Sequence, residues 1–304
     1  MSACDRPMPR GWTAIDDLPP PDVPGDLRYF YIGRRNGRLR LMFHDASGSV
    51  EVGGLDEAFE YTNPQLSPDG RRLMVLAFDK HSSRVLVATL DGQSGFEQIS
   101  TEGENWTCPS WSPDGTTVLV ERKVGTGRWA QSEYDLSTGR VDDFPMDTDV
   151  FRNLACADEY GDRLLVTGTE SGTSLIGIWL ESRTSGERTR FAVIEGCNSV
   201  FPVTIPGTQT VGVTSNCSNV YDRGLWTVRG PGAEPEHVLN GLVAAPSWSP
   251  DGAWLLFGHE RRYRDEPELW IASADGRFAV KVVDGWASWP AWIPAGVECA
   301  ICGR

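Results

Sequence analysis

Histidine and cysteine side chains are the groups in this sequence best suited to metal binding or nucleophilic chemistry. No pair of histidines has the close spacing of a zinc site on one element. The histidines are His44, His81, His237 and His259. Cys299 and Cys302 have the Cys-x-x-Cys spacing of redox and metal sites, but we expect a strand over residues 297–301, and residues three apart in a strand point to opposite faces. A structural role is therefore favoured for this pair, and no metal site is predicted.

Cys197 and Cys217 lie ten residues before and ten residues after Gly207, which we place in a tight turn. Antiparallel pairing of the two strands on either side of such a turn brings these positions together. In an oxidising compartment the two thiols are predicted to form a disulfide bond, whereas in a reducing cytosol they would remain free.

Composition bounds the function classes. The 304 residues include 33 glycines and 20 prolines, too many for a helical protein, and 40 % are hydrophobic, enough for a sizeable core. The formal net charge of −14 repels phosphate backbones, so no nucleic-acid partner is expected. No run of 18 apolar residues occurs, so no transmembrane segment is predicted.

A repeated turn organises the chain. Ser67-Pro68-Asp69-Gly70, Ser112-Pro113-Asp114-Gly115 and Ser249-Pro250-Asp251-Gly252 each precede an apolar run. Proline fixes φ for a turn, aspartate can accept hydrogen bonds from the amides that follow, and glycine takes the left-handed conformation that closes a hairpin. The aspartates are therefore expected to be structural, with a strand on each side of every turn.

Two series of turn glycines interleave with spacings of 44 to 47 residues, which gives four short strands per repeat. The first series is Gly70, Gly115, Gly161, Gly207, Gly252 and Gly296, and the second is Gly48, Gly92, Gly139, Gly186, Gly232 and Gly276. Trp179, Trp226 and Trp270 fall in the third strand of their repeats. Four strands at this period are typical of a β-propeller. The prediction is an all-β fold, a six-bladed β-propeller with four antiparallel strands in each blade.

The Ser-Pro-Asp-Gly segments resemble the repeat of TolB-type propellers, and the resemblance extends from about Gly25 onward. Two of the six turns depart from the motif, with Asp158-Glu159-Tyr160-Gly161 and Thr204-Ile205-Pro206-Gly207 in its place. Related propellers also precede the catalytic domain of prolyl-oligopeptidase-like peptidases, but no Gly-x-Ser-x-Gly motif occurs.

The loops at one face of such a propeller are expected to form a polar funnel edged with indoles, a composition that suits a protein, peptide or glycan ligand. The candidate ligand-binding residues are Asn105, Trp106, Arg152, His81, Lys123, His259 and Trp286. The predicted function is non-catalytic recognition or scaffolding by a monomer. The alternatives are a propeller enzyme, a lyase or hydrolase with its active site in the funnel, and an accessory subunit of a peptidase.

No cofactor is expected. A calcium ion on the propeller axis is the alternative, because Glu121, Asp149 and Glu170 are carboxylates of the funnel loops. These residues do not form the dense carboxylate loop of an EF-hand.

The two ends of the chain are expected to share one blade, because the two glycine series start out of phase. Residues 288–292 are predicted to be the inner strand beside residues 27–32, and residues 297–301 to replace or extend that pairing. Residues 1–24 are expected to be a flexible Pro-rich tail before a single domain of residues 25–304. Ser2-Ala3-Cys4 would also suit bacterial lipidation, and with it an extracytoplasmic location, if an apolar segment preceded it.

Overall fold

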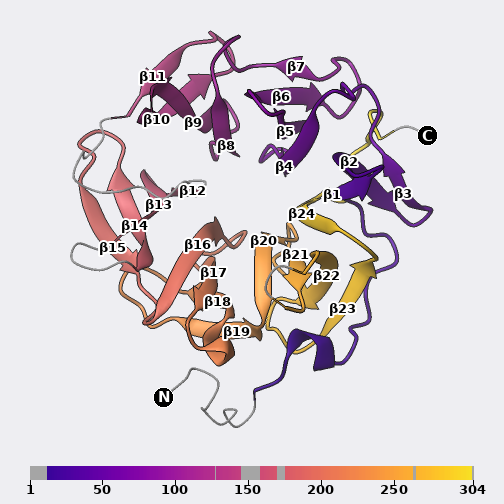
Figure 1. Ribbon diagram of the computed structural model, residues 1–304, viewed down its shortest axis with the longest axis vertical. Helices are drawn as coiled ribbons and strands as arrows, with labels where there is room; N and C mark the ends of the chain where they lie inside the picture. Colours follow the sequence, from indigo (N-terminus) through magenta and orange to yellow (C-terminus); the bar gives the residue numbers. More distant parts are fainter. Residues whose placement is uncertain (1–11, 127, 145–157, 170–174, 263–264, 303–304) are drawn as a thin grey trace. The chain divides into compact units, whose positions relative to one another are not determined.

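The computed structural model describes the chain in five stretches, residues 12–126, 128–144, 158–169, 175–262 and 265–302. They contain 24 β-strands and two short 3-10 helices, η2 (Ile15–Asp17) and η3 (Val220–Asp222) (Figure 1). No helix among these residues is long and apolar enough to cross a membrane.

The chain divides into two compact units. Unit 1 comprises residues 1–23 and 147–288, and unit 2 comprises residues 24–146 and 289–304. The strands of both units are grouped into four-stranded sheets of hydrogen-bonded neighbours.

Unit 2 contains three of these sheets. In hydrogen-bonded order, the first consists of β24 (Ala287–Trp292), β1 (Tyr29–Arg35), β2 (Arg38–Asp45) and β3 (Gly48–Glu51). The second consists of β4 (Glu60–Leu66), β5 (Arg72–Phe78), β6 (Ser83–Thr89) and β7 (Glu97–Gln98). The third consists of β8 (Trp106–Trp111), β9 (Thr117–Gly125), β10 (Arg128–Asp135) and β11 (Val141–Asp143).

Unit 1 contains the other three sheets. The first consists of β12 (Asp158–Tyr160), β13 (Arg163–Thr169), β14 (Ile176–Ser182) and β15 (Arg188–Ala192). The second consists of β16 (Cys197–Thr204), β17 (Val211–Cys217), β18 (Gly224–Val228) and β19 (Glu236–Asn240). The third consists of β20 (Leu242–Trp248), β21 (Trp254–Glu260), β22 (Glu268–Ser273) and β23 (Ala279–Val283).

The six sheets confirm the predicted fold class, an all-β, six-bladed β-propeller with four-stranded antiparallel blades. The pairing of β24 with β1 confirms that N-terminal and C-terminal strands share one blade. Trp179, Trp226 and Trp270 lie in β14, β18 and β22, each the third strand of its blade, as predicted.

The Ser-Pro-Asp-Gly turns have the expected geometry. In the first, the Ser67 hydroxyl donates to Asp69 Oδ1 and accepts from the Arg72 N–H, while the Arg71 N–H also donates to Asp69 Oδ1. Gly70 has φ of +68°, in the left-handed region that glycine enters at little cost. The same bonds recur around Asp114 and Asp251, so these aspartates serve the turns.

A feature that the sequence analysis did not predict lies in the innermost strands. A residue directly before a proline has a positive φ in five of them, and these residues are Asn63, Cys108, Phe201, Ala245 and Trp289. In β4, β8, β16 and β20 the register with the next strand shifts at the same place. Proline has no N–H for the ladder, and the resulting β-bulge bends the strand.

Apolar side chains join neighbouring blades within each unit. In unit 2 the cluster between the β4–β7 and β8–β11 blades includes Met74, Val85 and Trp106, all fully buried. In unit 1 the cluster between the β16–β19 and β20–β23 blades includes Leu225, Trp248 and Phe257. Burial of such large side chains contributes on the order of 2 kcal/mol each.

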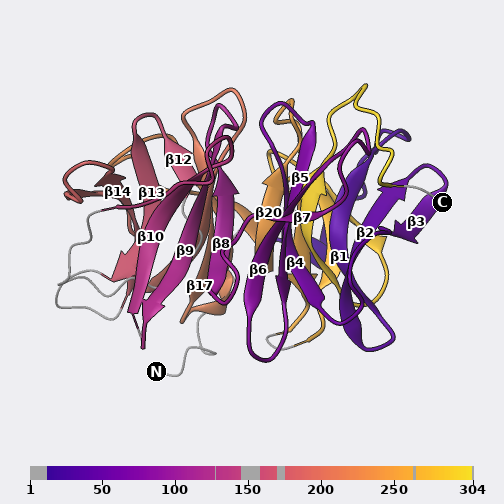
Figure 2. The ribbon, with the colours of Figure 1, turned by 90° about the horizontal axis from the view of Figure 1, so that it is seen from above.

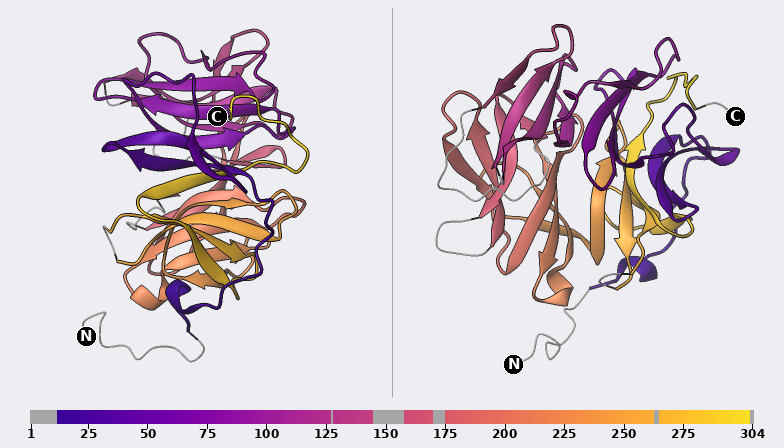
Figure 3. Two further views of the ribbon diagram at one scale, coloured as in Figure 1. Left: turned by 90° about the vertical axis from the view of Figure 1, so that its right-hand side faces the viewer. Right: turned by 45° about the horizontal axis from the view of Figure 1, so that its top comes forward.

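Part of the expected N-terminal tail is docked on unit 1. Ile15 is fully buried in the cluster around Leu225, and the Ala279 N–H donates to the Pro19 carbonyl. Figures 1 and 3 show this indigo segment beside β19 and β23. The expectation of a free tail is therefore wrong for residues 12–19. Ile15 is buried in an apolar pocket formed by residues distant in the chain, which the composition of residues 1–24 does not reveal.

The C-terminal residues after β24 form turns. The expected strand over residues 297–301 is absent from the described C-terminal residues, which run to Cys302. In the structure Cys299 and Cys302 form a disulfide bond, which is possible because a turn, unlike a strand, brings residues three apart to the same side. The Ala300 N–H donates to the Leu90 carbonyl and so fixes this turn beside the end of β6.

Candidate functional site

Asn105 connects two hairpins of unit 2. Its side-chain Oδ1 accepts from the Ser83 N–H at 2.9 Å, and its backbone carbonyl accepts from the Lys123 N–H at 2.9 Å. The first bond joins the loop before β8 to the start of β6, and the second joins it to β9. Both oxygens of Asn105 therefore position the neighbouring chain, so Asn105 is a positioning residue.

The same contact recurs elsewhere in the chain. Asn198 Oδ1 accepts from the Ile176 N–H at the start of β14, and Glu60 Oε1 accepts from the Leu39 N–H near the start of β2. In each case a side chain near the start of an inner strand binds the beginning of the third strand of the preceding blade. Its recurrence indicates a role in joining blades.

The loop between β5 and β6 directs its basic side chains outward. Asp79 Oδ1 accepts from the N–H groups of His81 and Ser82, both at 2.7 Å. The N–H bond from His81 holds the pKa of Asp79 below its usual value. Lys80 and His81 are exposed. One oxygen of the Asp79 carboxylate is thus bonded to the loop backbone, while Asp79, Lys80 and His81 are all exposed.

The hairpin between β9 and β10 presents a third basic residue, next in sequence to an apolar one. Lys123 is exposed and Val124 is 42 % exposed, among the most exposed large hydrophobic side chains in the described residues. We call Lys80, His81, Lys123 and Val124 the hairpin surface. Figure 2 shows the β5–β6 and β9–β10 hairpins at the same end of unit 2.

A set of ion pairs joins β9 to neighbouring segments. Arg122 Nη2 lies 2.8 Å from Asp143 Oδ2, and Arg122 Nη1 lies 3.4 Å from Glu104 Oε1. Glu104 Oε2 also accepts from the Trp106 indole N–H. These contacts hold β9 against the loop before β8 and place the carboxylate of Glu104 on groups of the protein itself.

Trp106 is not part of a ligand surface. Its side chain is fully buried among Met74, Val85 and Val118, with its ring 5.5 Å from that of Tyr134. The sequence-based assignment of Trp106 to a binding site is therefore wrong. Trp106 was predicted to lie in a funnel loop, whereas it is the first residue of β8 and its side chain packs between two blades.

His259 is also buried, at 3 % exposure, and both ring nitrogens have partners. Its Nδ1 lies 2.9 Å from the Leu242 carbonyl oxygen, and its Nε2 lies 3.2 Å from Asp16 Oδ2. The assignment of His259 to an open funnel is wrong, because the N-terminal segment covers it.

The remaining candidate residues are not part of the hairpin surface. Trp286, in unit 1, is half-buried and directly precedes β24. Arg152 lies outside the described residues, as do Asp149 and Glu170 of the proposed calcium site. Glu121, the third of those carboxylates, is buried in β9. Among the described residues no three His, Cys, Asp or Glu side chains form a group that could hold a metal ion.

Cys197 and Cys217 form a disulfide bond in the structure. They are direct partners in the register of β16 and β17, with Cα atoms 3.9 Å apart. The bond packs against Ile194 and Trp226 and closes the end of this hairpin.

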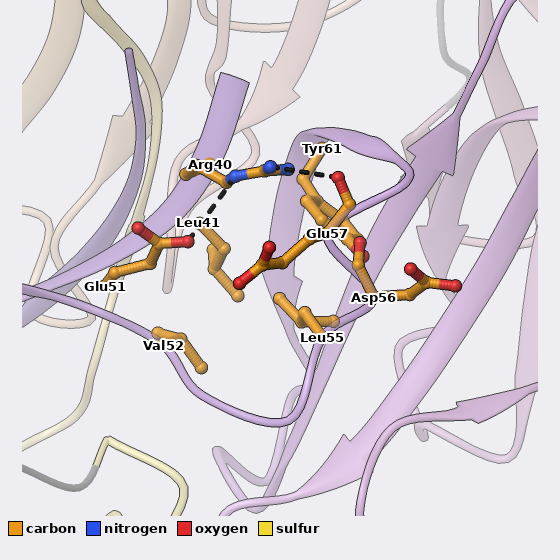
Figure 4. Close-up of a pocket in the computed structure, with 8 residues that line it drawn as sticks. All are labelled: Arg40, Leu41, Glu51, Val52, Leu55, Asp56, Glu57 and Tyr61. Carbon is orange, nitrogen blue, oxygen red and sulfur yellow. Dashed lines mark hydrogen bonds and ion pairs between the residues drawn. The ribbon is translucent and has the colours of Figure 1, made fainter. Parts of the chain in front are cut away.

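A small pocket lies in unit 2 beside the connection between β3 and β4 (Figure 4). It has a volume of about 190 Å³, including space open to solvent, and its residues are Arg40, Leu41, Glu51, Val52, Leu55, Asp56, Glu57 and Tyr61. Arg40 donates to the carbonyls of Glu57 and Phe59. Ligand pockets usually exceed 300 Å³, so this pocket is small for a ligand site, and the Arg40 bonds fix the connection.

Comparison with solved structures places the fold. TolB from Acinetobacter baumannii superposes with a TM-score of 0.72 and 22 % identity over 90 % of this chain and 68 % of that one. The fold is a TolB-like propeller. A putative TolB from Agrobacterium tumefaciens gives a TM-score of 0.62 and 17 % identity over 88 % of this chain and 99 % of that one.

Enzymes also share this TolB-like fold. An oligogalacturonate lyase in complex with manganese gives a TM-score of 0.54 and 13 % identity over 87 % of this chain and 74 % of that one. No family model matches the sequence, and no curated protein matches it. At these identities the likeness concerns the fold alone.

Proposed function

We propose that this protein is a non-catalytic recognition propeller whose hairpin surface binds an acidic segment of a partner protein. The observation that carries the proposal is that Lys80, His81, Lys123 and the apolar Val124 are all exposed on two hairpins at the same end of unit 2, while the carboxylates of Asp79 and Glu104 accept hydrogen bonds from the protein itself. Cationic groups beside an exposed apolar side chain suit a peptide with acidic and apolar residues.

The charge of the whole chain restricts where an acidic partner can bind. With a net charge of −14, the protein repels most acidic molecules at long range. An acidic partner would therefore bind only where basic side chains are gathered locally, and its binding would weaken with salt. Rim charges of this kind act mainly on the association rate and on the choice of partner.

Charge reversal tests the proposal. A fluorescein-labelled oligo-glutamate peptide is titrated into the wild type and into the Lys80→Glu/Lys123→Glu variant, and its anisotropy is measured. We expect the double variant to bind at least about tenfold more weakly, because two attractive contacts become repulsive. The matched control is Arg229→Glu/Arg277→Glu, which reverses two charges on exposed residues of unit 1. Equal binding by all three proteins would contradict the proposal.

An oligogalacturonate serves as a second polyanion in the same assay. Because the fold is shared with a lyase that acts on this class of glycan, its cleavage by the protein would favour the enzyme alternative. Tighter binding of the intact glycan than of the peptide would contradict a protein partner and favour a glycan ligand. The proposal predicts tighter binding of the peptide and no cleavage.

A further inference from the structure

Residues 12–19 lie in a groove on unit 1 that contacts both their side chains and their backbone. Ile15 is fully buried there, and its pocket is formed by side chains of two blades, among them Leu239, Trp248 and Trp270. Gly241 forms part of the wall, since a Cβ at that position would lie 3.1 Å from Ile15 Cδ1. The pocket thus fits one branched aliphatic side chain closely.

The backbone of the segment is held by bonds that do not depend on its side chains. Asn240 Nδ2 donates to the Thr13 carbonyl at 2.9 Å, and Ala14 forms a parallel β-bridge with Asn240. Further along, the Ala279 N–H donates to the Pro19 carbonyl at 3.1 Å. The segment is therefore held against the outer strands β19 and β23, by a β-bridge before the 3-10 turn of η2 and by a backbone bond after it.

Two further side chains of the segment have specific partners. Asp16 lies 3.2 Å from His259 Nε2 and 3.3 Å from Arg261 Nε. Trp12 packs edge-on against Tyr221 at 5.3 Å and donates its indole N–H to the Tyr221 carbonyl. The groove therefore contacts three side chains of a fixed pattern: an aromatic residue (Trp12), an aliphatic residue three positions later (Ile15), and a carboxylate directly after it (Asp16).

The segment is not needed to complete any sheet. Each of the six sheets has its four strands without residues 12–19. The chain that follows, residues 19–26, has three consecutive prolines and no strand. Proline keeps such a connection extended, so the segment can leave the groove without unpairing a strand.

We infer that this groove is a peptide-recognition site, and that residues 12–19 are a resident occupant that a partner segment of the same pattern, aromatic-x-x-aliphatic-acidic, displaces. The site is separate from the hairpin surface and does not depend on it. A tethered occupant acts at a local concentration on the order of 1 mM. A free peptide therefore binds appreciably only when the resident segment is weakened.

The test uses the full chain with Ile15→Asp, which places a charge in the apolar pocket and so releases the resident segment. The probe is a fluorescein-labelled peptide with the sequence of residues 12–19, Trp-Thr-Ala-Ile-Asp-Asp-Leu-Pro. We expect this variant to bind the probe at least about tenfold more tightly than the wild type does, because the tethered competitor is gone. No saturable binding by a folded Ile15→Asp chain would overturn the inference.

Peptide variants test the pattern. Replacing the probe's isoleucine by aspartate is expected to abolish binding, and Asp16→Asn to weaken it severalfold through loss of the contacts to His259 and Arg261. Asp17→Asn is the matched control, because Asp17 is the neighbouring carboxylate, exposed like Asp16 but outside these two contacts. Equal binding by the Asp16→Asn and Asp17→Asn probes would contradict the assigned specificity. If the Ile15→Asp/Lys123→Glu chain binds the probe as tightly as Ile15→Asp does, this site is independent of the hairpin surface.

Hydrogen exchange of the wild type keeps the inference testable if Ile15→Asp does not fold. The N–H groups of Asp17 and Ala279 bond to Ala14 and Pro19. If the segment leaves the groove, these amides exchange through a local opening, faster than the amides of β21. Exchange only with global unfolding would overturn the inference. Sedimentation that shows a dimer held by exchanged segments would also overturn the partner assignment, because the occupant would then be a second copy of the chain.

Discussion

Asp16 and His259 are 243 positions apart in the chain, and the carboxylate of one lies 3.2 Å from the imidazole of the other. The contact joins the N-terminal segment to β21, and His259 also contacts the Leu242 carbonyl and the Trp270 ring. His259 is therefore a buried anchor of the N-terminal segment.

Ile15→Ala is expected to lower the free energy of unfolding by about 2–4 kcal/mol, because it empties a fully buried pocket. The measurement is urea denaturation followed by far-UV circular dichroism. Asp17→Ala, at an exposed position two residues away, is expected to change stability by less than about 0.5 kcal/mol. Equal effects of the two substitutions would show that the segment is not docked in solution.

Deletion of residues 1–20, which a free tail would tolerate, is likewise expected to destabilise the protein.

Deletion of residues 286–304 is expected to cause aggregation or a large loss of stability. It removes β24 and so leaves an edge of β1 without its partner strand, and unpaired edges promote association. Size-exclusion chromatography and urea denaturation of the shortened chain check this. A stable monomer with one cooperative transition would contradict the shared blade.

The two disulfide bonds are expected to differ in their contribution to stability. The chain-entropy estimate gives about 3 kcal/mol for Cys197–Cys217, which are 20 residues apart, and about 1.5 kcal/mol for Cys299–Cys302, which are three residues apart. The midpoints of urea unfolding for Cys197→Ser/Cys217→Ser and for Cys299→Ser/Cys302→Ser, each measured with and without reductant, test the order. A larger loss from the C-terminal pair would contradict it.

The turn aspartates are expected to make the protein less stable in acid. Serine hydroxyls hold the pKa of Asp69 and of Asp251 below the usual 3.8, so the folded state binds protons less readily than the unfolded state. Their contribution is fully present above the unfolded pKa and declines as the pH falls below it. Thermal unfolding between pH 7 and about pH 3 should show a shallower decline for Asp69→Asn/Asp251→Asn than for the wild type. An unchanged slope would contradict this role.

Repeated local signals account for what the sequence predicted well. Ser67 to Gly70 carries its own turn chemistry, and glycines at regular spacing repeat it, so blade number and strand order follow from local structure. The closing pair of strands followed from the phase of the two glycine series.

Side-chain direction was predicted less well, because it depends on tertiary packing. Trp106 was expected in a loop of the funnel, but it is the first residue of β8 and its side chain packs in the cluster between two blades. Ile15 is a single apolar residue in a polar, Pro-rich stretch, and its burial depends on a pocket more than 200 positions away in the chain. The bulges of the inner strands could have been predicted from the proline that follows each of the five left-handed residues in those strands.

Mapping amide chemical shifts of the isotopically labelled protein during titration with oligo-glutamate tests the central claim most directly, because it locates the contact. The proposed function predicts saturable shifts concentrated in residues 79–83 and 121–126, which contain the hairpin surface, and their loss in Lys80→Glu/Lys123→Glu. Shifts confined to other parts of the chain, or equal shifts in the charge-reversed variant, would contradict it.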